Sequence, residues 1–268
     1  MRQSIHDNIY PSRVNLRWIM SKLGKTMLLY GRVSVFERLK ANPASIKKIM
    51  LQDNISLPDI EERAKANNVS LERLSIQQLK RFKPAKDLQG VIAQVERFHY
   101  TSFDRLFAQV QNKKLSLIFL DRINDPQNFG AIIRTVACFG GFAIVIPQFN
   151  ACGVTEAVLH VASGGENYVP IAIVPNLSNP LIQLKRSGCW IVGAEAGSGA
   201  SCVDNTSFPF PLVLVLGSEG EGIRYGIQKH LDLKVRIPMK GAELSFNVGI
   251  AGAVFCYEIS KQRKDEKI

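Results

Sequence analysis

The sequence predicts an α/β protein with two units, a smaller front unit and a larger unit that contains a parallel sheet. From Ser116 onward, continuous apolar strands alternate with helices, which is typical of a parallel sheet covered on both faces. The mean hydropathy of +0.01 and the hydrophobic fraction of 46% are those of an ordinary globular protein. No stretch approaches the roughly 18 consecutive apolar residues of a membrane span, so the sequence predicts no membrane association.

The front unit, residues 27–96, is predicted to be a small α/β domain. We expect strands at residues 27–30, 46–51, 69–74 and 89–95. We expect helices at residues 33–40, from Pro58 to about Asn67, and after the capping residue Ser75. Residues 80–86 are predicted to be a basic loop whose cations contact RNA phosphates, namely Lys80, Arg81, Lys83 and Lys86. Phe82 within this loop either stacks on a base or packs under its own helix.

The second unit is predicted to begin near residue 114, after a polar connection at residues 97–113. We expect its strands at residues 117–120, 142–146, 171–174, 190–193, 212–216 and 233–237. The last helix is expected to run from Val248 to about Lys261. Ligands of such sheets bind beyond the carboxyl ends of the strands, so a site is expected there.

Positive charge is concentrated in the front part of the chain. Residues 1–113 hold 20 Lys and Arg against 10 Asp and Glu, whereas residues 114–268 hold 14 against 13. This segregation favours a nucleic-acid partner, because cations that neutralise phosphates release counterions. A solvated basic surface without a specific partner is the alternative. Residues 1–26 are interpreted as a basic extension, with an organelle-targeting leader as the alternative.

Cysteine and histidine usage predicts a reducing cytoplasmic location and no metal. The five cysteines are odd in number and form no CxxC pair, which argues against both a disulfide framework and a zinc site. The four histidines are scattered without the spacing of metal ligands.

Three polar or glycine-rich clusters lie at or beside predicted strand ends. They are residues 121–130, which lead into a helix that carries Arg134, then 216–223 and 237–248. The second cluster has the glycine spacing of a phosphate-binding loop, but Ile223-Arg224 replaces the required Lys-Ser/Thr. Glu219 and Glu221 would also repel phosphate. A cationic or zwitterionic cofactor fits this acidic loop better than a nucleotide phosphate does.

Together, the three clusters resemble the three motifs of the SpoU (TrmH-like) family within the SPOUT methyltransferase superfamily. The front unit resembles the family's RNA substrate-binding domain, and the whole is closest to enzymes that make 2′-O-methylguanosine in bacterial 23S rRNA. The resemblance implies that residues 114–264 form a SPOUT-type α/β catalytic domain with a deep trefoil knot. It further implies S-adenosylmethionine as methyl donor, structured RNA as substrate and a homodimer.

The resemblance also implies site residues. The S-adenosylmethionine pocket is expected to contain Gly217, Ile237, Met239, Phe246, Val248, Glu195 and Ala196. The catalytic candidates are Arg134, Asn128, Glu219, Ser245 and Asn247. We expect Arg134, oriented by Glu219, to lower the pKa of a ribose 2′-hydroxyl electrostatically, because arginine is a poor base. A deprotonated Arg134 acting as the base is the alternative.

Each catalytic candidate also has a purely structural interpretation. Arg134 would be a surface residue, Asn128 a turn former, Glu219 a solvated charge, and Ser245 and Asn247 helix caps. The predicted function is 2′-O-methylation of a guanosine in 23S rRNA. A tRNA 2′-O-methyltransferase and a catalytically silent RNA-binding assembly factor are the alternatives, although the intact candidate set argues against the second.

Overall fold

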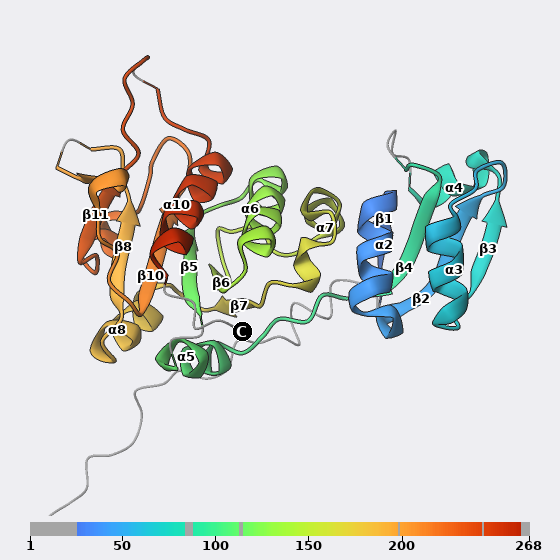
Figure 1. Ribbon diagram of the computed structural model, residues 1–268, viewed down its shortest axis with the longest axis horizontal. Helices are drawn as coiled ribbons and strands as arrows, with labels where there is room; N and C mark the ends of the chain where they lie inside the picture. The colour runs from blue at the N-terminus through green and yellow to red at the C-terminus, as the bar shows by residue number, and fades with distance from the viewer. Residues whose placement is uncertain (1–25, 84–87, 113–114, 198, 243, 264–268) are drawn as a thin grey trace, which may run out of the picture.

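The computed structural model describes residues 26–83, 88–112, 115–197, 199–242 and 244–263, which form two α/β domains (Figure 1). The front domain ends with the strand at residues 91–96, and the larger domain begins beyond residue 102. Both domains have the α/β class that the sequence predicts. Within the described ranges, no helix is both long and apolar enough to cross a membrane.

The front domain is a four-stranded sheet in the order β1-β4-β2-β3, with β4 antiparallel to both neighbours. Its elements are β1 (Thr26–Tyr30), α2 (Arg32–Ala41), β2 (Ile46–Gln52), α3 (Pro58–Ala66), β3 (Leu71–Leu74), α4 (Ile76–Phe82) and β4 (Val91–Glu96). Side chains of β2 alternate between the two faces, as the period of a strand requires. Ile49 and Leu51 face the core under α2 and α3, whereas Met50 packs with Leu79 of α4 on the other face.

Helices α3 and α4 begin at the expected residues, and the predicted side-chain cap is confirmed for α4. Ser75 accepts a hydrogen bond from Gln78 N, and the Gln78 side chain accepts one from Ser75 N, which completes a capping box. Pro58 opens α3, and the cap residue is Leu57, whose N–H donates to Glu61 Oε1. Local side-chain signals therefore fix both helix starts.

The larger domain has a seven-stranded sheet in the order β7-β6-β5-β10-β8-β11-β9, and all its pairings are parallel. Its strands are β5 (Ser116–Asp121), β6 (Phe142–Pro147), β7 (Ile171–Val174), β8 (Trp190–Ala194), β9 (Ser201–Cys202), β10 (Leu212–Gly217) and β11 (Leu233–Arg236). Its helices are α5 (Phe103–Gln111), α6 (Pro126–Phe139), α7 (Glu156–Ala162), α8 (Ser178–Arg186), α9 (Tyr225–Gln228) and α10 (Val248–Gln262). Three-residue 3₁₀ turns lie at η1 (Pro43–Ser45), η2 (Gly165–Asn167) and η3 (Val203–Asn205).

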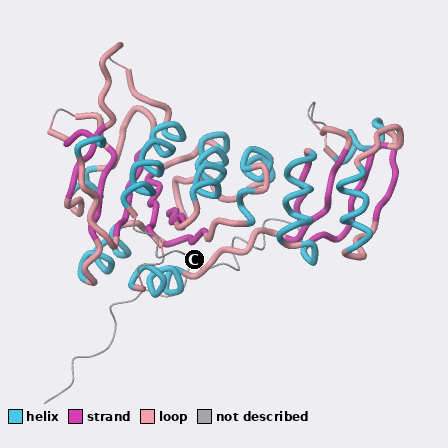
Figure 2. Tube along the Cα trace, in the orientation of Figure 1, coloured by secondary structure: helices cyan, strands magenta, loops and turns pink. Residues whose placement is uncertain are grey.

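Helices cover both faces of this parallel sheet (Figure 2). Residues of α6, α7 and α10 share one buried cluster with Ile118 and Leu120 of β5. Residues of α5, α8 and α9 share the other cluster with Leu117 and Phe119 of the same strand. Since β5 is buried on both faces, its sequence is continuously apolar, which is the pattern that predicted the fold.

The predicted linker at residues 97–113 is only partly a linker. Its second half is α5, which begins after the capping residue Ser102 and buries Leu106 and Val110 against the larger sheet. Thr101 N also donates to Ile171 O of β7. The buried apolar residues of α5 are separated by polar residues, so the sequence pattern indicated a simple connection and not a helix.

The C-terminal part of the chain recrosses the sheet. Strand β10 lies between β5 and β8, and β11 lies beyond β8, yet α10 packs against α6, the helix that follows β5 (Figure 1). At the far end of α10, Gln262 bonds to Thr206 O and to Phe208 N in the segment between β9 and β10. The predicted trefoil knot requires such a crossing, which brings residues 217–223 and 237–248 together.

Candidate active site

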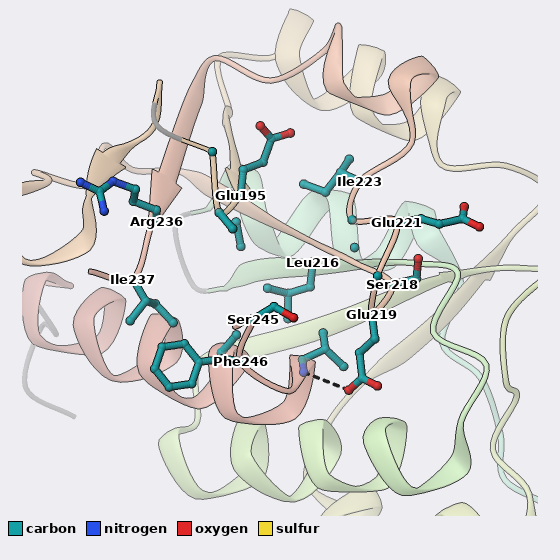
Figure 3. Close-up of a pocket in the computed structure, with 18 of the residues that line it drawn as sticks. Glu195, Leu216, Ser218, Glu219, Glu221, Ile223, Arg236, Ile237, Ser245 and Phe246 are labelled. Carbon is teal, nitrogen blue, oxygen red and sulfur yellow. Dashed lines mark hydrogen bonds between the residues drawn. The ribbon is translucent and has the colours of Figure 1, made fainter. Parts of the chain in front are cut away.

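One pocket of about 340 Å³ lies at the carboxyl ends of β8, β10 and β11 (Figure 3). The loops after these strands and the first turns of α10 form its wall. All seven predicted cofactor residues line it, namely Gly217, Ile237, Met239, Phe246, Val248, Glu195 and Ala196. Glu219 and Ser245 from the predicted catalytic set also line it. Segments far apart in the sequence thus form a single cavity where parallel-sheet ligands bind.

Gly217 allows the loop after β10 to fold back on itself. A Cβ atom at this position would lie 2.2 Å from the carbonyl carbon of Gly222, so no other residue fits without moving the loop. Gly222 N donates to Ser218 O at 2.9 Å and closes the turn. Gly220 and Gly222 have φ values of +84° and +65°, which glycine adopts without a steric penalty.

The end of β5 holds the same loop from the other side. The buried Asp121 carboxylate accepts hydrogen bonds from Arg224 N at 2.9 Å and from Arg224 Nε at 2.8 Å. The neighbouring Arg122 adopts a left-handed φ of 63° and pairs with Glu221. These positioning residues were not predicted from the sequence. Their one signal is that Asp121 lies directly at a strand's carboxyl end.

The pocket contains a carboxylate oxygen that needs a donor. Glu195 Oε2 pairs with Lys234 at 3.0 Å, whereas Oε1 is buried and has no hydrogen-bond partner among the described residues. Glu195 borders the cavity, so a bound group with an N–H, an O–H or a positive charge would satisfy this oxygen. The glutamates of this wall therefore suit a cationic or zwitterionic ligand better than an anionic one.

Three predicted catalytic residues form a hydrogen-bonded triad beside the pocket. Glu219 Oε1 accepts from Asn128 Nδ2 at 3.1 Å and from Asn247 Nδ2 at 2.6 Å. It also accepts from Val248 N at 3.4 Å (Figure 3). Asn247 Nδ2 also donates to Asn128 Oδ1 at 2.7 Å. The Asn247 side chain caps α10 at the same time, because its Oδ1 accepts from Gly249 N. The triad links α6, the loop after β10 and α10.

Arg134 stands apart from this triad. It lies six residues after Asn128 on α6, about 9 Å further along the helix axis, and its side chain is exposed. Within the described ranges, its guanidinium has no hydrogen-bond or ion-pair partner. Glu219 does not pair with Arg134 as expected, because Glu219 Oε1 accepts hydrogen bonds from Asn128 and Asn247 instead. Arg134 therefore offers an exposed cation outside the cofactor-sized cavity.

The predicted RNA-binding residues are arranged differently from the expected loop. Lys80 and Arg81 lie in the last turn of α4 with exposed side chains, while Lys86 lies outside the described residues. Lys83 Nζ pairs with Glu156 Oε2 of the larger domain at 2.8 Å, so it is not a free phosphate ligand. Phe82 is 47% exposed and does not pack under its helix, and Lys48 Nζ lies 5.8 Å from its ring centre.

Metal-binding chemistry has no visible basis in the described ranges, where no three His, Cys, Asp or Glu side chains gather as ligands. All five cysteines are free thiols.

The fold and site define a two-domain α/β protein with a ligand pocket at the carboxyl ends of parallel strands and a cation-bearing front domain. The model of the SpoU rRNA Methylase family matches residues 114–257, and the model of the RNA 2′-O ribose methyltransferase substrate-binding domain matches residues 28–101. The chain belongs to the SpoU rRNA methylase family.

Similar proteins cover most of the chain. An uncharacterized tRNA/rRNA methyltransferase of Synechocystis sp. is 36% identical over 243 residues, which are 88% of this chain but 62% of that protein. This chain therefore spans less than two thirds of that relative. The 23S rRNA (guanosine-2′-O-)-methyltransferase RlmB of Coxiella burnetii is 32% identical and is covered over 98% of its length by 90% of this chain.

The fold is also that of a solved structure. The SpoU methyltransferase AviRb from Streptomyces viridochromogenes, in complex with the cofactor AdoMet, superimposes with a TM-score of 0.74. The match covers 94% of each chain at 21% identity.

Proposed function

We propose that this protein methylates a ribose 2′-hydroxyl in structured RNA with S-adenosylmethionine as methyl donor, and that its target is a guanosine of 23S rRNA. The observation that carries the proposal is the meeting of residues 195–196, 217–219 and 237–248 in one acidic pocket, beside the helix that bears Arg134. Membership in the SpoU family and the match of the front domain to an RNA-binding module support the reaction type.

The residues of the pocket fit the proposed cofactor. Glu195 Oε1 would accept a hydrogen bond from a ribose hydroxyl or ammonium group, which would satisfy its buried lone pairs. Ile237, Met239 and Phe246 would supply apolar contact to the adenine and the methylthio group. When bound, S-adenosylmethionine supplies an electrophilic methyl carbon, to which the 2′-oxygen bonds as the carbon–sulfur bond breaks.

Arg134 would activate the hydroxyl. A guanidinium next to the 2′-oxygen stabilises the developing alkoxide and lowers the pKa of the hydroxyl, so its proton passes more readily to solvent water beside the exposed Arg134. The same cation would hold a neighbouring phosphate of the RNA backbone. Its lack of a partner in the described residues supports this role, because an arginine already bound to a carboxylate would have its positive charge offset.

The triad would position the reacting groups. Glu219 holds Asn128 at the first turn of the helix of Arg134, and it holds Asn247 at the start of α10. The cofactor loop and the helix that carries the cation therefore keep one relative placement. Ser245, which lines the pocket next to Phe246, would donate a hydrogen bond to substrate or cofactor.

Choice of RNA, assembly and location complete the proposal. The Coxiella relative is named for a 23S rRNA guanosine, which supports that target, while the name tRNA/rRNA methyltransferase of the Synechocystis relative keeps tRNA as the second candidate.

We propose a homodimer, supported by large apolar side chains exposed before and along α10, namely Leu244, Phe246, Ile250 and Tyr257. We place the reaction in the cytoplasm, where ribosomal RNA and tRNA are available.

Methyl transfer by an Arg134→Ala variant tests the proposal. Tritiated methyl transfer from S-adenosylmethionine to 23S rRNA and to tRNA is measured for both proteins, and cofactor binding by calorimetry. We expect the variant to lose transfer by about 100-fold or more while cofactor affinity stays within about twofold. Wild-type protein without transfer to either RNA, or unchanged turnover of the variant, contradicts the proposal. Comparing 2′-O-methylation maps with and without the gene then identifies the nucleotide.

A further inference from the structure

The two domains meet through a turn of the larger domain that contains two adjacent glycines. A Cβ atom on Gly164 would lie 2.4 Å from Glu37 Cβ of α2 in the front domain. A Cβ atom on Gly165 would lie 3.1 Å from Arg134 Cα of α6. The backbone of this turn is therefore in direct contact with the front domain on one side and with the helix segment of Arg134 on the other.

An ion pair beside the glycines is buried between the domains. Arg38 Nη2 of α2 lies 3.0 Å from Glu166 Oε1 of η2, and the two side chains are 6% and 0% exposed. Arg38 Nη1 also donates to Ser45 Oγ at 3.4 Å. Burial raises the pKa of Glu166, and the charge of Arg38 opposes that shift. While the domains are docked, removal of either member alone would leave the other charge buried without a counter-ion, which is strongly disfavoured.

Further contacts surround this ion pair. Glu156 of α7 accepts from Leu28 N at 2.8 Å and from Lys83 Nζ at 2.8 Å, both of the front domain. The rings of Tyr30 and His160 stack with centres 4.1 Å apart. The side chains of Tyr168 and Glu37 share a hydrogen bond of 2.6 Å across the same interface. Domains of one chain move relative to each other by default, and this set of specific contacts opposes such motion.

Helix α6 connects this interface to the cofactor pocket. Its Gly130 allows α7 to approach so closely that a Cβ atom there would lie 2.5 Å from Val161 Cβ. Its first turn carries Asn128, which bonds to Glu219 of the pocket. Figure 1 shows α7 between α6 and the front domain. One helix thus contacts the pocket, α7 and the turn at Gly165.

We propose that the Arg38–Glu166 ion pair and the Gly164-Gly165 turn fix the RNA-binding domain at one distance from Arg134, and thereby select which nucleotide is methylated. This inference rests on the proposed function. RNA held on the front domain would present one 2′-hydroxyl to Arg134, because a rigid connection between the domains keeps the RNA at one distance from this residue. Arg38 and Glu166 act as positioning residues, since neither lines the cofactor pocket.

The test uses full-length Glu166→Gln and the double variant Arg38→Met with Glu166→Met, which replaces the ion pair by apolar groups of similar size. Glu61→Gln is the matched control, because it makes the same change in the exposed Glu61–Arg73 pair within the front domain. For each protein we would measure cofactor affinity, kcat and KM for RNA, the position of the methyl group by primer extension, and the radius of gyration by X-ray scattering.

We expect Glu166→Gln, which leaves Arg38 buried without its carboxylate, to scatter as a looser particle and to lose about tenfold or more in kcat/KM for RNA. The double Met variant leaves no buried charge unpaired, so it should stay compact and keep most of the wild-type rate. With Glu166→Gln, methyl groups should appear on neighbouring nucleotides, while cofactor affinity stays within about twofold and the Glu61→Gln control resembles wild type. Tyr168→Phe, which removes only the half-exposed hydrogen bond to Glu37, serves if both buried variants fail to fold, and it should shift the methylation pattern in the same direction.

Two results overturn the inference. One is unchanged scattering of the folded Glu166→Gln variant, and the other is a loosened variant that keeps the wild-type rate and methylation position. Failure of the proposed function looks different, because the wild-type protein itself would then transfer no methyl group, whereas the scattering comparison would still report on the ion pair.

Discussion

Asn247 Nδ2 lies 2.6 Å from Glu219 Oε1, while Oδ1 of the same asparagine accepts the N–H groups of Gly249 and Ile250. One side chain therefore caps α10 and joins the cofactor loop to that helix. The cap interpretation of Asn247 is confirmed, whereas its catalytic role stays a prediction. The two roles use different atoms of the amide, so substitutions can separate them.

Asn247→Ser and Asn247→Ala should differ in stability but not in activity. Serine retains an acceptor for the first turn of α10, whereas alanine does not, so alanine should be less stable by about 1 kcal/mol. Neither variant keeps the donor to Glu219, and both should therefore lose most methyl transfer. Urea unfolding and a transfer assay check this. A serine variant with wild-type turnover would show that the link to Glu219 is dispensable.

Gly217→Ala should disrupt the pocket. The added methyl would lie 2.2 Å from the Gly222 carbonyl carbon, so the loop must move, and affinity for S-adenosylmethionine should fall by about tenfold or more. Gly226→Ala is the control, because a Cβ there meets nothing within 4 Å and α9 favours alanine. Calorimetric titration with S-adenosylmethionine measures the affinity of both variants. Equal affinities would mean that the tight turn does not shape the pocket.

Replacing Arg224 or Asp121 one at a time should lower the stability of the protein by unequal amounts. Asp121 is fully buried, whereas the Arg224 side chain is 41% exposed. Arg224→Met leaves a buried carboxylate with one backbone donor and should cost about 3 kcal/mol. Asp121→Asn returns Arg224 to water and should cost about 1 kcal/mol.

Denaturant unfolding of both variants measures this difference. If Asp121→Asn costs more stability than Arg224→Met, the guanidinium rather than the carboxylate depends on the pair.

The sequence predicted the strands well because a strand buried on both faces is a continuous apolar run. The expected strand at residues 171–174 coincides with β7, and the last helix differs by one residue at its end. The two-residue β9 was missed, since so short a strand depends on its neighbour β11 and leaves no periodic pattern.

The pocket was predictable, but the partners of its charges were not. The resemblance to the SpoU family implies that Gly217, Ile237 and Phe246 share one pocket, and all three line the same cavity. Lys83 looked like an RNA ligand because its neighbours are basic, yet it pairs with Glu156, 73 residues away. Such pairings depend on how domains dock, and no local pattern encodes that.

Tyr100 should make stability depend on pH in the alkaline range. Burial raises its pKa from 10.0 to about 12, and its hydroxyl oxygen accepts a hydrogen bond from Val154 N at 2.8 Å. Because the folded pKa exceeds the unfolded one, the stabilisation is complete below about pH 10 and is lost as pH rises toward 12. By pH 11 the loss is about 1.4 kcal/mol.

Urea unfolding of wild type and Tyr100→Phe at pH 8 and pH 11 isolates this effect, since the other tyrosines titrate alike in both proteins. At pH 8 the wild type should be more stable by about 1 kcal/mol, because the variant leaves Val154 N without its acceptor. At pH 11 that advantage should disappear. A stability difference that stays constant between the two pH values would mean that the Tyr100 hydroxyl ionises in the folded protein as readily as in water.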